Sequence, residues 1–296
     1  KSEAISINSE AISINSKAIS INSAAIFFDS VDLCPLTTEY CTNPKLASSY
    51  DLSRYARSTF FARTDEIDAM PTRATQSMTA PQQWHSQGGY ITLLGHSIFV
   101  VDEGSPAQPI LLLIHGFPTS SWDWQPVWQQ LRAHFRVIAL DMLGFGFSDK
   151  PKNHRYSIHG QADVVEALIH AKQLNRFHVL AHDYGDTVAQ ELLARQLDGN
   201  GAGQWLSCCF LNGGLFPETH RALLTQKLLL SPFGALINHL SNFNQFRRNF
   251  SSVFGAETKP SEQELNDFWW LINVNHGKHV FHNLITYIND RKKHRE

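Results

Sequence analysis

An acidic residue stands at the end of an apolar run of strand length, and this feature restricts the possible folds more than any other. The run 177–181 leads into His182-Asp183-Tyr184-Gly185, with the small residues Ala181 and Gly185 two positions on either side of Asp183. This spacing is typical of a sharp turn from a strand into a helix, where only small side chains fit beside the residue at the tip. A carboxylate exposed there can attack an electrophilic carbon and form a covalent ester. The alternative role for Asp183 is a helix N-cap, which aspartate often provides.

Apolar runs alternate with amphipathic stretches from Gly89 onward. A continuous run such as 110–114 suits a strand that is buried on both faces of a parallel sheet. The alternation therefore predicts an α/β fold with a doubly wound, mostly parallel sheet. We expect strands at 90–94, 97–101, 110–114, 136–140, 177–181 and 206–211, and helices at 122–134, 158–172 and 187–196.

The loop after the third expected strand reads His115-Gly116-Phe117-Pro118. In folds with a nucleophile at a strand–helix turn, this loop supplies one backbone N–H of the oxyanion hole, and the residue after the nucleophile supplies the other. We expect Phe117 and Tyr184 to be these two donors. His115 is expected to fix the loop and border the substrate site rather than act as a base.

A glycine-rich turn, Asp141–Asp149, follows the fourth expected strand. It contains Gly144-Phe145-Gly146, but Asp149 stands where the third glycine of a dinucleotide fingerprint would fall, and Lys150-Pro151 prevents an immediate helix. A structural turn is the preferred interpretation.

Composition excludes several classes of protein. Twenty-five basic residues against 27 acidic ones give no excess of positive charge for nucleic acid. Four cysteines are too few for a disulfide framework, and Cys208 and Cys209 are expected to be buried thiols. No run approaches the ~20 apolar residues of a membrane span, and no secretory signal is found, so the cytoplasm is the expected compartment. No metal or cofactor is predicted, and the oligomeric state is left open.

The first 85 residues differ from the rest of the chain. A seven-residue repeat fills 2–22, but its isoleucines lie two and five positions apart, which does not fit a coiled-coil seam. Residues 24–85 are mixed and polar, with one short helix expected near 52–61. We expect 1–85 to be a low-complexity, poorly ordered extension and 86–215 to be the catalytic core.

These motifs together resemble one family. The loop at His115, the turn at Asp141 and the elbow at Asp183 are similar to those of α/β-hydrolases of the epoxide hydrolase and haloalkane dehalogenase type. The resemblance is stronger still to the mesoderm-specific transcript branch, through Leu143–Pro151, Asn212-Gly213-Gly214 and Phe216–Arg221. It covers residues 89–291.

The resemblance implies a helical lid over Asp183. The lid would span 216–290, followed by a basic tail at 291–296, and helical spacing is found at 223–230, 236–243, 262–273 and 280–288. Phe268, Trp269 and Trp270 would line a pocket for a small apolar substrate, although a core role is equally compatible with them. By the same resemblance, Tyr287 would be a lid acid that protonates an opened epoxide.

The resemblance also bears on the reaction. Dehalogenases bind the halide with an indole or amide group where this chain has Tyr184 and Phe117, so epoxide or ester hydrolysis through an Asp183 ester is favoured. The family's acid and histidine follow later strands that are not found before Glu296, and neither Glu218 nor a late histidine replaces them convincingly. The chain is therefore expected to be an incomplete copy. The alternative is a catalytically incomplete fragment or a non-enzymatic binding protein that lacks the base.

Overall fold

A computed structural model describes residues 26–29, 78–213, 216 and 224–294. The repeat at 2–22, the helix expected near 52–61, Cys34 and Cys41, and Glu218 lie outside these ranges, as do the last two residues of the basic tail.

The described residues form a seven-stranded sheet with the order β1-β7-β6-β4-β5-β3-β2. The pairs β4·β5, β4·β6 and β6·β7 are parallel, whereas β2·β3, β3·β5 and β1·β7 are antiparallel. The strands are β1 (Ile26–Asp29), β2 (Gly89–Leu93), β3 (His96–Glu103), β4 (Ile110–Ile114), β5 (Arg136–Leu140), β6 (Arg176–His182) and β7 (Gln204–Leu211). The predicted α/β class is confirmed, and the sheet is mixed, with its parallel pairs at the centre and its antiparallel pairs toward the two edges.

The apolar composition of the central strands follows from their burial on both faces. In β4, Leu112 and Ile114 pack into the core on one face, and Leu111 and Leu113 pack into the core on the other. Successive side chains of a strand point to opposite faces, so a strand between two helical layers needs an apolar residue at every position.

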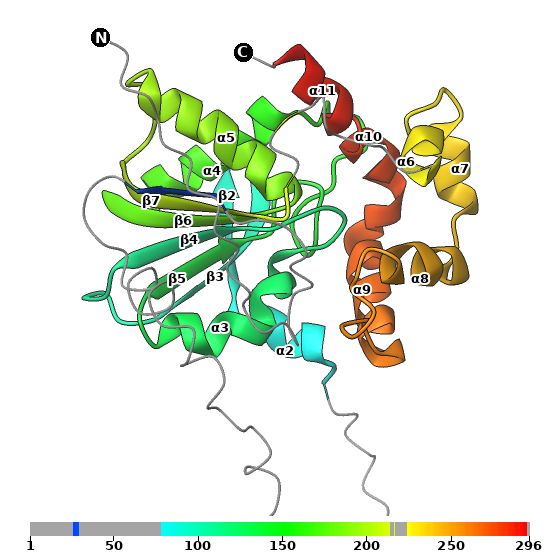
Figure 1. Ribbon diagram of the computed structural model, residues 1–296, viewed down its shortest axis with the longest axis horizontal. Coiled ribbons are helices and arrows are strands. Elements are labelled where there is room, and N and C mark those ends of the chain that lie inside the picture. Colours follow the sequence, from blue (N-terminus) through cyan, green and yellow to red (C-terminus); the bar gives the residue numbers. More distant parts are fainter. Residues whose placement is uncertain (1–25, 30–77, 214–215, 217–223, 295–296) are drawn as a thin grey trace, which may run out of the picture.

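Helices cover both faces of the sheet (Figure 1). One layer holds α4 (Ile158–Ala171) and α5 (Tyr184–Leu197), and the other holds α2 (Ala80–Gln87) and α3 (Gln125–Arg132), which follows the short 3-10 helix η3 (Ser121–Trp124). Each begins within three positions of the predicted start, except for α2, which was not predicted.

The ordered core begins earlier than the predicted boundary at residue 85, because that boundary falls inside α2. Trp84 of α2 is buried, its ring lies 4.8 Å from the Trp128 ring, and its Nε1 donates to Ser121 Oγ at 3.1 Å. The sequence of α2 is short and shows no sustained helical repeat of apolar residues, so it was not predicted. The contact with α3 in the folded chain shows why this helix forms.

One side of β7 faces away from β6 and the parallel centre of the sheet. In the structure β1 pairs with it antiparallel, with Ile26 opposite Phe210 and Asp29 opposite Ser207. The extension expected to be poorly ordered thus contributes a strand, because an open edge offers unpaired N–H and C=O groups to any extended segment that reaches it.

The lid packs beside the sheet (Figure 1). It consists of α6 (Leu224–Leu229), α7 (Gly234–Leu240), α8 (Phe243–Ser251), α9 (Glu262–Asn273), the 3-10 helix η5 (Val274–Val280), α10 (Phe281–Leu284) and α11 (Tyr287–Lys293). The bounds of α9 agree with the prediction, whereas α8 was not predicted and the helix expected at 280–288 is divided at Ile285-Thr286. None of the described helices combines the length and apolar composition needed to cross a membrane.

The basic tail predicted at 291–296 begins inside the last lid helix, and its first residue is buried. Arg291 lies in α11 and is buried, and its charge acts on Asp186 and Tyr287. The buried cation in turn favours the ionised forms of these two groups and opposes the effect of burial on their pKa values. Lys292 and Lys293 are exposed, as expected.

Candidate active site

Asp183 occupies the tip of the turn between β6 and α5. Its φ of 52° is in the left-handed region, which an aspartate adopts only when its surroundings require it. The N–H of Asp183 donates to Leu211 O of the neighbouring strand at 3.0 Å, so the tip is held against the end of β7. The side chain makes no capping hydrogen bond to α5, so the helix-cap alternative does not apply.

The small residues around Asp183 are required by close contacts. A Cβ on Gly185 would lie 2.7 Å from His115 O and 2.8 Å from Ile114 C, which belong to the backbone at the end of β4. A Cβ on Gly116 would lie 2.8 Å from the Cβ of Asp183. The turn, the strand end and the loop therefore pack backbone to backbone, and this contact brings the loop to the carboxylate.

The loop after β4 places a donor on the carboxylate. Phe117 N donates to Asp183 Oδ1 at 2.8 Å. His115 is fully buried, with Nδ1 2.8 Å from Gly116 O and Nε2 accepting from Met142 N at 3.0 Å. Both ring nitrogens are thus engaged with the backbone, which agrees with the expected loop-fixing role and leaves neither available to a substrate. The Phe117–Pro118 peptide bond is cis.

The glycine-rich turn supports this loop rather than binding a nucleotide. Asp141, at the end of β5, accepts hydrogen bonds from Ser121 N at 2.7 Å and from Phe147 N at 2.6 Å. A Cβ on Gly146, whose φ is +46°, would overlap the Asp141 carboxylate. Buried donors occupy both carboxylate oxygens, so the turn is a structural link between β5 and η3, as its sequence predicts.

Aromatic rings of the lid pack against the residues on either side of the site, Phe117 and Tyr184. The Tyr287 ring lies 4.4 Å from the Tyr184 ring and 6.1 Å from the Phe117 ring, and Phe281 lies 5.4 Å from Phe117. Burial and the nearby Asp183 charge raise the pKa of Tyr287 well above its usual value. The hydroxyl therefore stays protonated in the physiological range and can donate a proton or a hydrogen bond.

The three consecutive lid aromatics do not face one pocket. Successive helical residues project about 100° apart, and on α9 they contact different parts of the protein. The Phe268 ring lies 4.8 Å from Trp122 in η3, the Trp269 ring lies 5.3 Å from Phe246 within the lid, and the exposed Trp270 lies 6.0 Å from Phe147. Of the three, Phe268 alone contacts the element that follows the Phe117 loop.

Two carboxyl groups near Asp183 were not singled out by the sequence. Burial, together with the charges of Asp141 and Asp183, raises the pKa of Asp123 to about 8. Burial and the Asp183 charge raise the pKa of Asp186 to about 8 as well, and its Oδ1 accepts from Leu211 N at 3.3 Å. Like charges in a buried site disfavour each other's ionisation, so both groups keep their protons at neutral pH. The sequence offered one signal for each: Asp123 comes shortly after the Phe117 loop, and Asp186 lies one helical turn after Asp183.

His182 also lies at the site, immediately before Asp183. Burial lowers the pKa of its imidazole, against the opposing effect of the Asp183 charge. Its ring packs 6.3 Å from Trp124. A neutral imidazole packed on an indole is a structural contact.

The raised carboxyl pKa values predict a specific dependence of stability on pH. Unfolded Asp186 would lose its proton near pH 4, whereas the folded chain retains it to about pH 8. The unfolded state is therefore stabilised as pH rises between these values, and the folded chain loses stability. We expect Asp186→Asn to remove this loss. The free energy of unfolding of the variant, relative to that of the unmodified chain, should therefore be higher at pH 8 than at pH 5 by more than ~1 kcal/mol.

Urea unfolding at both pH values measures this difference. Asp198→Asn, at the exposed end of the same helix, is the matched control and should follow the unmodified chain at both pH values. Equal pH dependence of the Asp186→Asn variant and the unmodified chain would show that Asp186 is ionised in the folded state.

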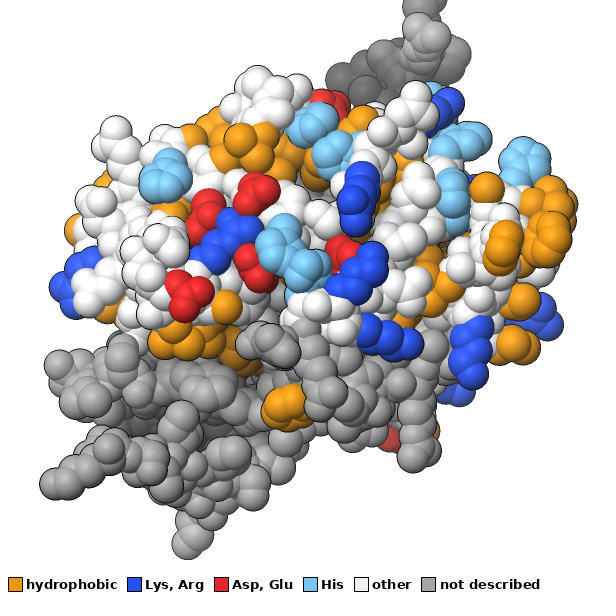
Figure 2. Space-filling model, turned by 90° about the horizontal axis from the view of Figure 1, so that it is seen from above, with side chains coloured by type: hydrophobic (Ala, Val, Ile, Leu, Met, Phe, Trp, Pro, Cys, Tyr) orange, Lys and Arg blue, Asp and Glu red, His pale blue; other side chains and the backbone are white. Residues whose placement is uncertain are grey.

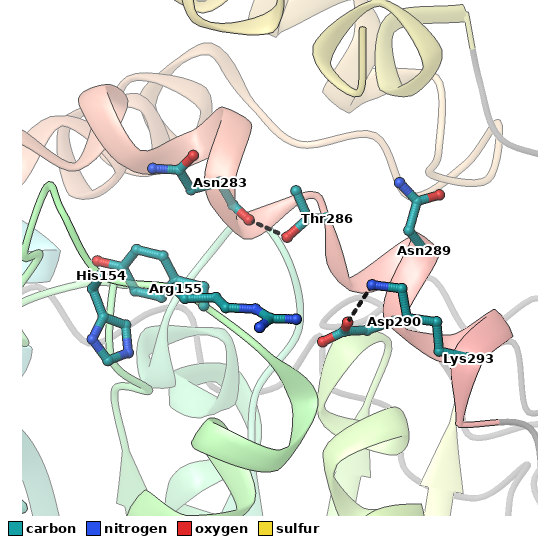
Figure 3. A pocket seen from close by; sticks show the side chains of 8 residues that line it. His154, Arg155, Asn283, Thr286, Asn289, Asp290 and Lys293 are labelled. Carbon is teal, nitrogen blue, oxygen red and sulfur yellow. Dashed lines mark hydrogen bonds and ion pairs between the residues drawn. The ribbon is translucent and has the colours of Figure 1, made fainter. Parts of the chain in front are cut away.

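A polar hollow of about 310 Å³ lies elsewhere, between the loop before α4 and helices α10 and α11 (Figure 3). It is lined by His154, Arg155, Tyr156, Asn283, Thr286, Asn289, Asp290 and Lys293. None of the predicted site residues contributes to it, so it is separate from the Asp183 site. Within the described ranges, no cluster of His, Cys, Asp and Glu side chains has the arrangement of a metal site.

Comparison with known proteins agrees with this geometry. Residues 109–230 match the family described as the alpha/beta hydrolase fold. The mesoderm-specific transcript homologue proteins of Bos taurus and Homo sapiens are each 50% identical over 233 residues, which cover 74% of this chain and 68% of theirs. The chain belongs to the α/β-hydrolase family. The putative hydrolase LipZ of Mycobacterium tuberculosis is 36% identical over 219 residues, 73% of this chain and 75% of its own. The resemblance inferred from the motifs is therefore confirmed.

Solved structures share the architecture. Haloalkane dehalogenase DbeA of Bradyrhizobium elkani superposes with a TM-score of 0.56 at 21% identity, covering 70% of this chain and 72% of its own. The epoxide hydrolase CorEH gives a TM-score of 0.53 at 20% identity over 69% of this chain and 72% of its own. At such identities the likeness shows the fold and leaves the reaction to the residues of the site.

Proposed function

We propose that this α/β-fold hydrolase uses Asp183 as a nucleophile that forms a covalent ester with a small apolar epoxide. With an ester, the second substrate class, the same carboxylate would attack the carbonyl carbon, form a mixed anhydride with the acyl group and release the alcohol. The observation that carries the proposal is the contact of Phe117 N with Asp183 Oδ1. It divides the carboxylate into one oxygen held by a backbone donor and one oxygen, Oδ2, that is left to attack.

The first step follows from this division. Oδ2 attacks an epoxide carbon, the carbon–oxygen bond of the ring breaks, and the leaving oxygen takes up the proton of the Tyr287 hydroxyl. Tyr287 is buried beside the turn and stays protonated at neutral pH, which suits it to this role. The product of this step is a hydroxyalkyl ester of Asp183.

The second step places negative charge on Oδ1. When water attacks the carbonyl carbon of the ester, Oδ1 becomes the oxyanion, and the N–H groups of Phe117 and Tyr184 are the proposed donors to it. Preorganised donors at a developing charge often contribute the largest single part of catalysis. This hydrolysis requires a base that activates water. A chain that lacks such a base would stop at the ester, and it would then act as a trap or a binding protein rather than a turning-over enzyme.

Mass spectrometry of the intact chain tests the proposal. After incubation with styrene oxide we expect a mass increase of one substrate molecule, which peptide mapping assigns to Asp183. An aryl ester tests the second substrate class, through a mass increase equal to its acyl group and release of the phenol. 1-Chlorobutane should leave the mass unchanged, since Tyr184 and Phe117 offer no indole or amide side chain for halide. Labelling elsewhere, or intact ligand bound without any adduct, would contradict the proposal and favour a binding protein.

The role of Tyr287 gives a separate prediction. We expect Tyr287→Phe to slow the formation of the styrene oxide adduct by about 10²-fold, because the alkoxide loses its proton donor while the ring still packs on Tyr184. Quench-flow mass spectrometry measures the rate. Tyr90→Phe, on β2, is the control and should label at the unmodified rate. A Tyr287→Phe variant as fast as this control would remove Tyr287 from the mechanism.

A further inference from the structure

Two lid helices, α6 and α7, expose apolar side chains that a helix packed only against the rest of the protein would bury. On α7, the buried residues are Gly234 and Asn238, and Asn238 Nδ2 donates to Lys278 O. Leu236 and Leu240 are 56% and 64% exposed instead. Surface helices of globular proteins normally bury the apolar stripe and expose the polar one.

The neighbouring segments continue this exposed face. Phe233 lies three positions before Leu236, on the same side of the helical spiral, and is 68% exposed. On α6, Leu224 and Leu228 lie one turn apart and are both exposed. We refer to these five residues of α6, α7 and the turn between them as the apolar lid face. Contiguous exposed apolar surface is uncommon on a soluble protein and marks a site of interaction.

The charges around the apolar lid face have one sign. Residues 219–256 contain no aspartate or glutamate. Lys227 lies beside Leu224 and Leu228 on α6, and both Lys227 and Arg248 of α8 are exposed. Figure 2 shows hydrophobic and basic side chains together at the right-hand end of the molecule, with no acidic side chain in view there. An apolar face bordered by cations and free of anions is complementary to a surface that offers hydrocarbon beneath negative charge.

We propose that the apolar lid face docks on an anionic membrane surface. The leucine and phenylalanine side chains enter the boundary between headgroups and acyl chains, and Lys227 contacts the anionic headgroups. The attraction of the cations is screened by salt, whereas the apolar contribution is not, so binding is expected to weaken partly, not completely, as salt rises.

The lid connects this face with the Asp183 site. Lys278 of η5 donates through Nζ to His239 O and Ser241 O at the end of α7, so α7 and η5 are joined by hydrogen bonds on both sides. Phe281 follows η5 directly and packs on Phe117, the residue that donates to Asp183. The docking surface and the wall of the site thus belong to one packed body. The inference does not depend on the proposed reaction, because lipid binding is measured without any substrate.

Flotation of the full chain with vesicles tests the proposal. We expect binding to vesicles of phosphatidylcholine with about one-quarter phosphatidylserine, and weaker binding to pure phosphatidylcholine. The double variant Phe233→Ser/Leu236→Ser should bind the anionic vesicles at least ~10-fold less, since two inserted side chains are lost. Leu197→Ser is the matched control, because Leu197 is 80% exposed on α5, outside the apolar lid face.

A second pair of variants tests the charges. Lys227→Glu should weaken binding to anionic vesicles, whereas Lys152→Glu, an exposed lysine in the loop before α4, should have no effect. Circular dichroism confirms that each variant is folded. The proposal is overturned if the unmodified chain does not float, if Leu197→Ser reduces binding as much as the double variant, or if sedimentation shows that the face joins two copies of the chain instead.

Discussion

The variant Asp183→Asn is expected to lose adduct formation with styrene oxide by at least ~10⁴-fold, the largest effect of any single substitution proposed for this chain. The amide is nearly the same size and its oxygen can still accept the hydrogen bond from Phe117 N, so the turn should keep its shape. An amide nitrogen has no anionic lone pair with which to open an epoxide, so the covalent step is lost while the fold remains.

The measurement is the time course of the mass increase in the intact protein. Asp198→Asn makes the same chemical change at the exposed C-terminal end of α5 and should label like the unmodified chain. An adduct that still forms on the purified Asp183→Asn variant at a comparable rate would identify another nucleophile. The free energies of unfolding of the two variants should agree within about 0.5 kcal/mol if the loss is chemical rather than structural.

The second large effect is structural. We expect Gly185→Ala to destabilise the chain by roughly 3 kcal/mol or more, because the added methyl group would overlap backbone atoms of Ile114 and His115. Backbone at the end of a central strand cannot move aside as the tip of a flexible side chain can. Relief would require shifting α5 away from β4, and with it the turn that holds Asp183.

Urea unfolding followed by tryptophan fluorescence measures this loss. Gly89→Ala provides the matched control, since an added Cβ at the start of β2 meets no atom within 4 Å, and its effect should stay within about 0.5 kcal/mol. Equal unfolding midpoints for the two variants would mean that α5 and β4 are not packed as closely as described. A folded Gly185→Ala chain should also label more slowly with styrene oxide, because the carboxylate is displaced from Phe117.

Some residues of the site could be identified from the sequence, and others could not. Asp183 could be found because its signals are local: small residues at fixed offsets, an apolar strand before it and a helix after it. Signals of this kind can be recognised in a single sequence. Phe117 could be found in the same way from the loop that contains it. Asp123 and Asp186 could not, because their raised pKa values come from burial and from the Asp183 charge, and neither property is visible before the chain is folded.

Among the lid aromatics, the sequence predicted a shared role for three neighbours, and the helix separates them. Phe268 faces η3, Trp269 faces α8 and Trp270 remains exposed. The reverse holds for Phe281 and Tyr287, which are six positions apart and meet at Phe117 because η5, α10 and α11 bend around it. Proximity along the chain is a poor guide to proximity in a body made of short helices.

By itself, the sequence determined the alternation of buried strands and helices, the turn that exposes Asp183 and the loop that brings a backbone donor to it. These features depend on side-chain size, hydrophobicity and backbone freedom over a few neighbouring residues. Only the tertiary structure decided that α2 joins the core through Trp84, that β1 covers the edge of β7, that Arg291 is buried and that α7 turns its leucines outward. Each of these outcomes depends on which distant segment occupies the neighbouring space, and that is settled by packing of the whole chain rather than by any local pattern.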